Sequence, residues 1–471
     1  MDPRPPAVPA PPALVAALPS HVRDVITRLA AAGYETVAVG GGVRDALLGR
    51  AVLGPWDLAT AATPPAMIGL FPDAVPTGIE HGTVTLPHPA GAIEVTSYRA
   101  DIGAGDGRRP DRVEFGVSLA GDLARRDFTV NALAYDPAAG LLFDTTGGLA
   151  DLAARMLRAV GDPHARFRED ALRPLRAARL AATLEFEVEP ATRAALGSIA
   201  DLVPRLSHER VRDEVGRMLL ALRPSAGFAL LHESALLPLL LPELSCCVGV
   251  RQNRFHAWDV YTHTLHTIDA APCEARLRWA ALAHDLGKPA TRVELPDGEA
   301  TFHGHAQVGA EIADRMLARL RLPRDEREAV VLLVREHLFD YRAEWTDAAV
   351  RRFMRRVGVE ALPDLFALRR ADAFATRPGP HDLGALDALA GRIAAELARR
   401  PPLAVRELAV DGADAMRVLG APPGPAVGRA LTRLLEEALD DPATNERGHQ
   451  IARLEEFARE GSEGGGQGGS P

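Results

Sequence analysis

The chain has 471 residues, of which 47% are hydrophobic and 25% charged, and its formal net charge at pH 7 is −9. This length predicts several domains of ordinary globular composition. No apolar run reaches the roughly 18 residues that a membrane helix needs, so we expect no membrane association. The negative net charge argues against blanket binding to nucleic acid, although it leaves room for a local basic channel.

The ends of the chain and its cysteines give little sign of ordered structure or disulfides. Residues 1–20 are rich in proline and are expected to form a disordered leader, and the glycine-rich residues 460–471 a disordered tail. Cys246, Cys247 and Cys273 include no C-x-x-C pair. Without a disulfide framework, a reducing cytoplasm is the expected location.

The order of apolar patterns predicts an α+β protein: a small mixed head followed by a long, mostly helical body. Residues 21–150 alternate β-like runs (ETVAVG, TVTLP, AIEVTSY, VEFGV, ALAYD, LLFD) with short helices. From about residue 151 strand signals vanish and amphipathic helices follow one another. The body is divided into a helical neck over 151–248, a histidine-rich helical region over 249–400 and a helical C-terminal region over 401–459.

The first motif of the head is a strand that runs into three glycines. Val37 to Val39 predict the strand, Gly40, Gly41 and Gly42 the turn, and Val43 to Leu48 the helix. Glycines let backbone N–H groups approach a phosphate closely, and the start of a helix favours an anion. A tight strand–helix turn without any ligand is an equally good interpretation of this motif alone.

Two carboxylates follow on later strands of the head. Asp57 begins the run DLAT, and the period of two in AIEVTSY places Glu94 and Thr96 on one face. Such a pair beside a glycine turn can hold Mg²⁺, which would activate a 3′-hydroxyl and neutralise charge on an α-phosphate. The alternative for Glu94 is a solvated strand residue.

The run LARRDFTVNALAYD concentrates charged and polar residues before a strand. Its arginines, including Arg126, can clamp phosphates, and Asp127 can accept a hydrogen bond from a ribose hydroxyl. A surface ion pair is the alternative.

Taken in order, these motifs resemble the bacterial class II CCA-adding tRNA nucleotidyltransferase and poly(A) polymerase family, whose head is of the polymerase β type. The resemblance rests on GGGVRDALLG with WDLAT, EVTSYR with DGRRPDRVEF, RRDFTVNALAYD, GDPHARFREDALRPLRAARL and RLSHERVRDE. Residues 405–447 also resemble the C-terminal region of many members. The nucleotide-binding residues that it implies are Gly40, Gly41, Gly42, Arg44, Asp45, Arg126, Asp127, Asn131, Asp170, Arg173 and Arg176.

The resemblance implies that the protein itself selects the base, through Asp170 and Arg173 in the neck. A carboxylate and a guanidinium three residues apart share a helix face and offer an acceptor and a fork of donors to CTP or ATP. An i,i+3 surface salt bridge is the alternative. Pro174 falls inside the predicted helix, where it predicts a local kink.

Two positions depart from the family pattern, Pro174 within the base-selecting helix and Pro55 before the first metal carboxylate. Pro55 stands where the family has the first metal-binding aspartate, which leaves Asp57 and Glu94 as the catalytic carboxylates for Mg²⁺. Losing one metal ligand is expected to weaken metal binding and slow nucleotide transfer.

The histidine-rich region resembles the HD-domain metal-dependent phosphohydrolases. Histidine and aspartate bind divalent metals that polarise a phosphate and its attacking water. The resemblance implies that either a transition metal or Mg²⁺ binds His263, His284, Asp285 and Asp372. His305, His337 and Lys288 are expected near the phosphate or a second metal. Each histidine alone is more often structural, and Lys288 alone reads as a cation at a helix C-terminus.

The sequence therefore predicts an enzyme that adds CCA, or A alone, to the 3′ end of tRNA from CTP and ATP, with a phosphohydrolase in its HD domain. The expected partners are the tRNA acceptor end and the two nucleotides. One alternative is a head impaired by Pro55 that only binds RNA for the HD site, and another is a poly(A) polymerase. The DGRRP loop favours CCA or A addition over CC addition alone. Nothing in the sequence indicates an oligomeric state.

Overall fold

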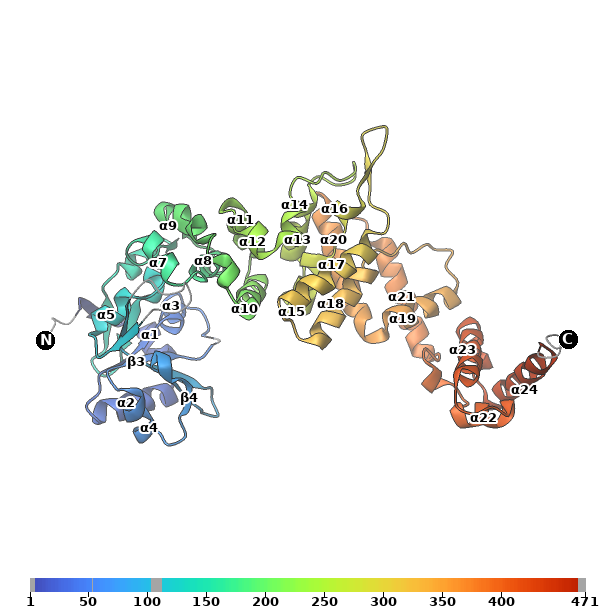
Figure 1. Cartoon of the computed structure of the whole chain (residues 1–471), viewed down its shortest axis with the longest axis horizontal. Helices are drawn as coiled ribbons and strands as arrows, with labels where there is room; N and C mark the ends of the chain where they lie inside the picture. The colour runs from blue at the N-terminus through green and yellow to red at the C-terminus, as the bar shows by residue number, and fades with distance from the viewer. Residues whose placement is uncertain (1–4, 53, 103–111, 465–471) are drawn as a thin grey trace, which may run out of the picture. The chain divides into compact units, whose positions relative to one another are not determined.

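The computed structural model describes residues 5–52, 54–102 and 112–464 (Figure 1). Its contacts fall into two compact units. The first comprises residues 1–248 with the segments 273–278 and 315–323, and the second comprises the rest of the chain from residue 249. Among the helices of the described ranges, none is long and apolar enough to cross a membrane.

The first unit contains one large sheet with strand order β1-β10-β9-β2-β3-β6-β5-β4. Neighbouring strands are antiparallel except β3 and β6, which run parallel. A separate hairpin joins β7 (Arg99–Ile102) to β8 (Arg112–Phe115). The strands of the large sheet are β1 (Ala7–Pro9), β2 (Thr36–Val39), β3 (Asp57–Thr60), β4 (Val75–Gly78), β5 (Thr83–Leu86), β6 (Ile93–Ser97), β9 (Leu133–Asp136) and β10 (Leu141–Asp144).

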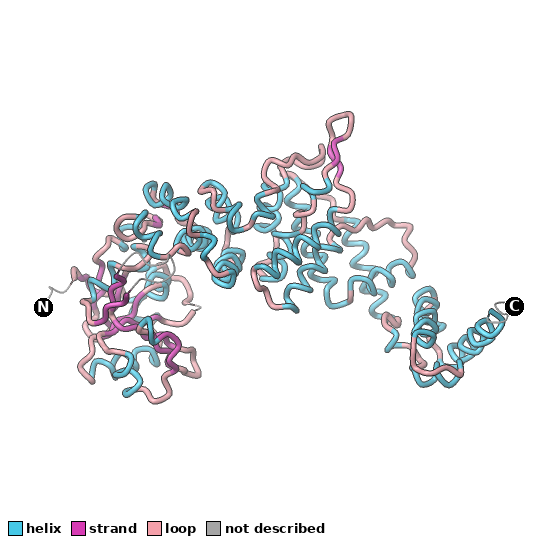
Figure 2. The backbone as a smooth tube through the Cα atoms, viewed as in Figure 1, coloured by secondary structure: helices cyan, strands magenta, loops and turns pink. Residues whose placement is uncertain are grey.

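Short helices accompany this sheet and close its core, so the predicted mixed head is confirmed (Figure 2). The core brings Val37 and Val39 of β2 together with Phe143 of β10 and Leu123 of a nearby helix. The helices are α1 (Pro12–Ala17), α2 (Ser20–Ala31), α3 (Gly41–Leu47), α4 (Pro64–Leu70), η1 (Ile79–His81), α5 (Leu119–Ala124), η2 (Thr129–Asn131) and α6 (Gly148–Ala153).

The predicted disordered leader is wrong for its described residues. β1 pairs antiparallel with β10, Ala7 opposite Phe143, and α1 follows with Leu14 fully buried. The prolines are compatible with this because proline is tolerated on an edge strand and in the first turn of a helix. At the other end, α24 (Arg447–Gly464) extends beyond the predicted start of the tail at residue 460.

The neck is helical as predicted, with one small ladder between β11 (Met156–Leu157) and β12 (Glu187–Val188). Its longest helices are amphipathic, and each buries one face against its neighbours. The elements are α7 (Pro163–Glu169), α8 (Arg173–Leu184), α9 (Pro190–Ala195), η3 (Leu196–Ile199), η4 (Val203–Arg205), α10 (His208–Leu219), α11 (Pro224–Glu233), α12 (Leu237–Leu240) and α13 (Pro242–Ser245).

The predicted continuous helix through Asp170 and Arg173 is wrong. α7 ends at Glu169, Asp170 has an extended backbone (φ −142, ψ 104), and α8 begins at Arg173 with Pro174 in its first turn. Proline suits that position because its missing N–H is not needed there, so Pro174 starts a helix instead of kinking one. The two predicted base-reading residues therefore do not share a helix face.

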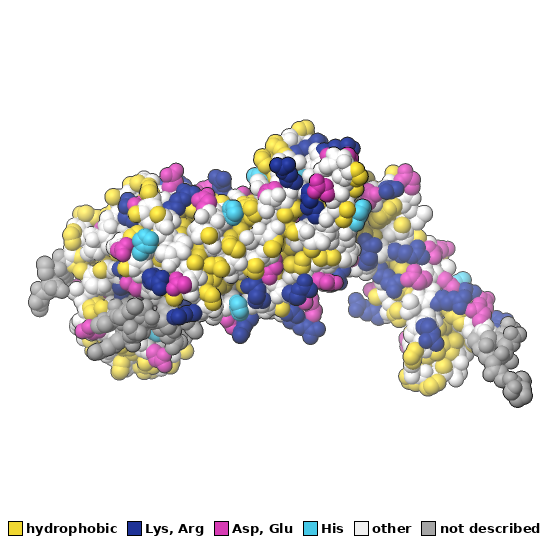
Figure 3. All heavy atoms as spheres, turned by 45° about the horizontal axis from the view of Figure 1, so that its top comes forward, with side chains coloured by type: hydrophobic (Ala, Val, Ile, Leu, Met, Phe, Trp, Pro, Cys, Tyr) yellow, Lys and Arg dark blue, Asp and Glu magenta, His cyan; other side chains and the backbone are white. Residues whose placement is uncertain are grey.

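The second unit is built of helices with one short hairpin, β13 (Val293–Glu294) and β14 (Ala300–Thr301). On the face shown in Figure 3, basic and acidic side chains are interspersed over the C-terminal helices. The helices are α14 (Val260–Ala270), α15 (Ala275–Ala283), α16 (Lys288–Thr291), α17 (His305–Arg319), α18 (Arg324–Glu336), α19 (Asp347–Val357), η5 (Val359–Ala361), α20 (Leu362–Thr376), α21 (Gly384–Arg399), η6 (Val405–Glu407), α22 (Gly412–Leu419), α23 (Pro425–Asp440), η7 (Pro442–Thr444) and α24.

Candidate functional site

The two carboxylates of the head lie on neighbouring parallel strands. Asp57 is the first residue of β3 and pairs in register with Glu94 of β6, so the two side chains stand on the same face of the sheet. The glycine turn approaches them closely: Gly40 has φ +76, and a Cβ at that residue would lie 3.0 Å from Asp57 Oδ2. Only glycine suits both the backbone angle and the space.

The surroundings of Asp57 combine burial with nearby positive charge. Burial raises the pKa of Asp57 to about 6, the charge of Arg126 acts in the opposite direction, and Glu94 raises the pKa further. A second guanidinium, that of Arg176, also lowers it. A carboxyl group in this position gains most from a bound cation, because the cation favours the ionised form that burial disfavours.

Pro55 lies two residues before Asp57 and is exposed. Between them Trp56 is buried against Gly42, where an added Cβ would lie 2.9 Å from Trp56 Cε3. Within the described ranges, the groups of three metal-ligating side chains all lie in the second unit. The head thus offers the carboxylate pair of Asp57 and Glu94.

A cavity of about 530 Å³ opens at this pair and is walled by arginines. Asp122, fully buried on α5, orients two of them: it accepts hydrogen bonds from Arg125 Nε (3.0 Å) and NH2 (2.7 Å) and from Arg126 NH2 (3.1 Å). Burial alone would raise the pKa of Asp122, but the charges of Arg126 and Arg125 lower it. The arginines lining the cavity are Arg99, Arg125, Arg126, Arg173, Arg176 and Arg210.

The predicted ribose-reading residues form a chain of hydrogen bonds beside the cavity. Asp127 Oδ1 accepts from Asn131 Nδ2 (3.0 Å), and Asp127 Oδ2 pairs with Arg176 NH1 (3.2 Å). Asn131 Oδ1 in turn accepts from Arg44 NH1 (2.6 Å). Arg44 also binds Asp45 and is buried. Both Asp127 and Asn131 line the cavity, whereas Gly42, Arg44 and Asp45 are outside its lining.

The neck contributes the other wall of the cavity. Asp170 and Arg173 both line it, Asp170 from the break between α7 and α8 and Arg173 from the first residue of α8. Arg210 of α10 also lines it and binds the Asp170 carboxylate. Arg126 Nε, Arg176 Nε and Arg210 NH1 are buried without an acceptor in the described part of the chain. Unsatisfied guanidinium donors are costly, so this wall suits an anionic ligand.

Sequence reasoning missed Asp122 and Arg210. A signal for Asp122 existed, because it precedes Arg125 and Arg126 by three and four residues, which is the spacing of partners on one helix face. The spacing of Arg210 from Asp170, 40 residues along the chain, carries no such signal.

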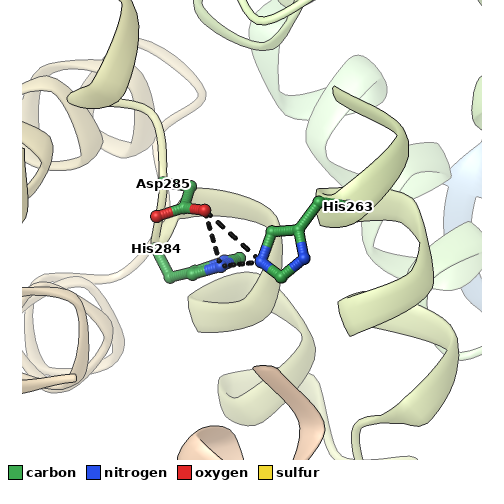
Figure 4. A group of neighbouring side chains, drawn as sticks. All are labelled: His263, His284 and Asp285. Atoms are coloured by element: carbon green, nitrogen blue, oxygen red, sulfur yellow. Dashed lines mark hydrogen bonds and ion pairs between the residues drawn. The ribbon is translucent and has the colours of Figure 1, made fainter. Parts of the chain in front are cut away.

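The second unit gathers the four metal ligands predicted for the HD domain in one cluster. His263 of α14 and His284, just after α15, bring their Nε2 atoms within 3.2 Å of each other (Figure 4). Asp285 Oδ2 lies 3.4 Å from His263 Nε2 and 3.2 Å from His284 Nε2. Asp372 of α20 places Oδ1 3.1 Å from His263 Nε2. All four residues are buried.

Asp285 also faces a second pair of histidines. Its Oδ1 lies 3.5 Å from His305 Nε2 and 3.9 Å from His337 Nε2, so its two oxygens face different pairs. The ligand atoms of His263, His284 and Asp285 lie within 4.8 Å of one another, and so do those of Asp285, His305 and His337. Asp285 is therefore the shared member of two candidate metal sites.

Three of the histidines are held in the tautomer that a metal requires. The Nδ1 atoms of His284, His305 and His337 donate to the carbonyls of Ala281, Phe302 and Val334 at 2.7–2.8 Å. When Nδ1 carries the proton of a neutral ring, the lone pair of Nε2 is directed at the cluster. Burial lowers the pKa of His337 to about 3, so that ring stays neutral.

The electrostatics of Asp285 suit a bound cation. Burial opposes its charge, but His284 and Lys288 hold its pKa well below the usual value. Its Oδ2 is buried and accepts no hydrogen bond of good geometry, although Lys288 Nζ lies 2.6 Å away as an ion pair. Burial lowers the pKa of His284, but Asp285 and Asp372 together raise it by more, so a bound metal would take the place of the proton that Asp285 favours on that ring.

Comparison with known proteins assigns a family to each part. The model for the poly A polymerase head domain matches residues 36–158. The model described as "Probable RNA and SrmB- binding site of polymerase A" matches 185–247, and the HD domain model matches 260–377.

Two curated relatives match most of the chain. An A-adding tRNA nucleotidyltransferase of Deinococcus radiodurans is 40% identical over 344 residues, 69% of this chain and 76% of the relative. A CC-adding tRNA nucleotidyltransferase of Thermus thermophilus is 39% identical over 417 residues, 85% of this chain and 89% of the relative.

A solved structure, the Bacillus stearothermophilus CCA-adding enzyme in complex with CTP, matches with a TM-score of 0.71 and 29% identity, covering 94% of this chain and 98% of the other. The predicted fold class is thereby confirmed. Because the two curated relatives match most of its length at this level of identity, the chain belongs to the bacterial CCA-adding tRNA nucleotidyltransferase and poly(A) polymerase family, in the group with an HD domain, and it is a nucleotidyltransferase.

Proposed function

We propose that the head and neck add CCA, or the terminal A alone, to tRNA 3′ ends from CTP and ATP. The observation that carries this is the single cavity in which Asp57, Glu94, an arginine wall and the Asp170/Arg173 pair converge. A carboxylate pair suits catalysis, guanidinium groups suit a triphosphate, and an acceptor beside a donor suits the edge of cytosine or adenine. A tRNA substrate and free cysteines fit the cytoplasm.

The carboxylate pair fits one magnesium ion. Mg²⁺ takes oxygen ligands, needs only one or two protein carboxylates, and completes its shell with substrate phosphates and water. Asp57 and Glu94, adjacent in register, supply such a pair. Bound there, magnesium would polarise the α-phosphate and lower the pKa of the attacking hydroxyl. The arginines anchored by Asp122 would orient the triphosphate and offset its charge.

The product is proposed from the sequence and the relatives together. One of the two relatives above is named for adding A and the other for adding CC, so sequence similarity alone does not decide between these products. The DGRRP loop, which favours CCA or A, lies at residues 106–110, outside the described residues. Incubating the purified protein with tRNA lacking A, CA or CCA, together with labelled CTP or ATP and Mg²⁺, separates the products by length.

Pro55 favours one alternative, in which the head binds RNA but transfers nucleotides poorly. If the wild-type protein transfers nucleotides and Pro55→Asp does not raise the rate, the impaired-head alternative is eliminated. No transfer by wild type with a gain in Pro55→Asp would eliminate the proposed activity. A poly(A) polymerase would instead give ladders longer than CCA on the same gel.

For the HD domain we propose a metal-dependent phosphohydrolase. The Nε2 atoms of three histidines held through Nδ1 converge on the buried carboxylate of Asp285, a set of nitrogen and oxygen ligands that fits a divalent metal. His263, His284, Asp285 and Asp372 would hold one ion, and Asp285 with His305 and His337 a second. Bound metal would supply a polarised phosphate and a nucleophilic water. Lys288, buried beside Asp285, would neutralise phosphate charge.

Metal content after dialysis tests this assignment. The double variant His284→Ala/Asp285→Ala should lose its bound transition metal and its hydrolysis of a chromogenic phosphodiester. The matched control is His266→Ala, which alters an exposed histidine on the same helix as His263. Metal content that is equal in the double variant and the control would refute the ligand set.

A further inference from the structure

The polar face of β5 and β6 carries threonines next to the carboxylate pair. Buried apolar residues alternate with polar residues along both strands, and the polar face holds Glu94 and Thr96 of β6 and Thr83 of β5. Thr96 follows Glu94 by two residues, about 7 Å along the strand. Thr83 pairs in register with Thr96. The polar face of the sheet therefore continues from the carboxylates into a pair of hydroxyl groups.

These two hydroxyl groups form one hydrogen-bonded unit. Thr83 Oγ1 and Thr96 Oγ1 lie 2.9 Å apart, and within the described residues this is the one side-chain hydrogen bond that either hydroxyl makes. Since one hydroxyl donates to the other, the pair keeps a second O–H donor and several acceptor lone pairs. The pair can thus both donate to and accept from one further hydroxyl group.

A neighbouring pair on the same sheet shows the purely structural form of this arrangement. Thr77 of β4 and Thr85 of β5 join their hydroxyls at 2.8 Å, and threonine pairs across strands stabilise sheets without any ligand. The difference between the pairs is the cavity, because Thr83 and Thr96 line it whereas Thr77 and Thr85 are outside its lining. The first pair is therefore open to a bound substrate, and the second is its matched structural control.

Nucleotide transfer brings two riboses to the carboxylates, one from the incoming nucleotide and one from the RNA end. In an in-line displacement, the attacking hydroxyl and the leaving pyrophosphate stand on opposite sides of the phosphorus. Neighbouring strands follow the order β9-β2-β3-β6-β5, with the carboxylates on β3 and β6. The glycine turn follows β2, and Asp127 and Asn131 precede β9. The groups for the incoming nucleotide thus lie on one side of the carboxylates, and β5 with Thr83 lies on the other.

We propose that Thr83 and Thr96 bind the terminal ribose of the acceptor RNA and read its 2′-hydroxyl. The 2′-hydroxyl stands next to the attacking 3′-hydroxyl, is both a donor and an acceptor, and distinguishes RNA from DNA. Its two hydrogen-bonding roles match those that the threonine pair leaves open. This rests on the proposed nucleotide addition and goes beyond it, because it assigns to the head a preference for RNA ends.

The test compares acceptor ends that differ in one oxygen atom. Transfer RNA lacking its terminal A is prepared with either cytidine or 2′-deoxycytidine as its last nucleotide, and kcat and KM for both ends are measured with ATP and Mg²⁺. Thr83→Val/Thr96→Val removes both hydroxyls at nearly constant shape, and Thr83→Ser/Thr96→Ser keeps them. The matched control is Thr77→Val/Thr85→Val, and thermal melts check that each variant folds.

The measured quantity is the ratio of kcat/KM for the ribose end to kcat/KM for the deoxyribose end. The intrinsic effect of the missing oxygen is the same for every protein and cancels when these ratios are compared. Thr83→Val/Thr96→Val should lower the ratio by about 10-fold, the size expected for one or two neutral hydrogen bonds. The loss should fall on the ribose end, while the deoxyribose end is used as in wild type.

Thr83→Ser/Thr96→Ser should keep most of the ratio, and Thr77→Val/Thr85→Val should keep all of it. A ratio in Thr83→Val/Thr96→Val that equals the wild-type ratio would overturn the proposal, even if the variant were slower with both ends. Such a uniform loss would mean that the pair only stabilises the sheet.

If wild type adds no nucleotide to either end, the proposed function fails, and equilibrium binding then decides the role of the threonine pair. The same two tRNAs are titrated into wild type and into Thr83→Val/Thr96→Val. Tighter binding of the ribose end by wild type that is lost in the variant supports the role. A ratio of the two affinities that is the same in both proteins overturns it.

Discussion

The buried carboxylate of Asp122 is expected to control nucleotide affinity without touching the nucleotide. In Asp122→Asn the shape is kept, but one oxygen becomes an NH₂ group that faces guanidinium donors. Three hydrogen bonds, from Arg125 Nε and NH2 and from Arg126 NH2, lose their charged acceptor. Arg126, which also stands beside Asp57, then loses the partner that fixes it.

The geometry sets the size of the effect. Breaking a buried ion pair on one side costs about 3–5 kcal/mol. The side chains of Arg125 and Arg126 are 16% and 17% exposed and can regain some hydration, which places the loss of stability near the lower end, about 3 kcal/mol. For nucleotide binding, one misplaced guanidinium at the triphosphate should weaken affinity about 10-fold, or about 1.4 kcal/mol.

Urea denaturation and CTP titration measure the two effects. The pKa of Asp122 is lowered in the folded protein, so its stabilisation is present above the unfolded value and lost as pH falls through the folded value. The stability gap between wild type and variant should therefore shrink in acid. As a control, Asp151→Asn removes a buried carboxylate that binds Arg158 and lies outside the cavity lining. Equal CTP affinity in wild type and Asp122→Asn would refute the reasoning.

Three further outcomes follow from buried charges. Because burial raises the pKa of Asp57 to about 6, the affinity of the head for Mn²⁺ should rise from pH 5 to 7 and then level off. Electron paramagnetic resonance on a variant without HD metal measures this affinity. An affinity that does not change with pH would contradict the prediction. Arg351→Met removes the buried donor to Glu396 Oε2 and to two carbonyls at the end of α23, while Arg399 keeps its bond to Glu396 Oε1, and should cost about 3 kcal/mol in urea unfolding. A loss under about 1 kcal/mol would show that the Arg351–Glu396 pair is dispensable. Lys288 is the single lysine of the chain and is paired with Asp285. Acylation of its amine should therefore be faster in Asp285→Asn than in wild type. Equal acylation rates in the two proteins, measured by mass spectrometry, would disprove the pairing.

The strands of the head were predictable because apolar and polar residues alternate along them in the sequence. The same period of two, with parallel pairing of β3 and β6, is what sets Glu94 beside Asp57. The histidines scattered between His263 and His337 were also predictable as a cluster, since few structural patterns combine an HD pair with three more histidines.

Other features depend on contacts that local sequence does not encode. The apolar spacing around Asp170 suits an unbroken helix, and the break follows from Pro174 in the first turn of α8, with Arg210 then holding the freed carboxylate. β1 forms because β10, which lies far along the chain, offers a free edge. Proline content alone favours disorder and gives no sign of that partner.

Proline also has a consequence for how this sheet behaves in a crowded cell. The two outermost strands, β1 and β4, each contain a proline, Pro9 and Pro76, and each is only three or four residues long. An outer strand that lacks an N–H is a poor template for a further strand, so both ends of the eight-stranded sheet resist recruiting another chain. Deleting the chain up to Pro11 would uncover β10, a strand without proline, and should make the protein self-associate through its sheet.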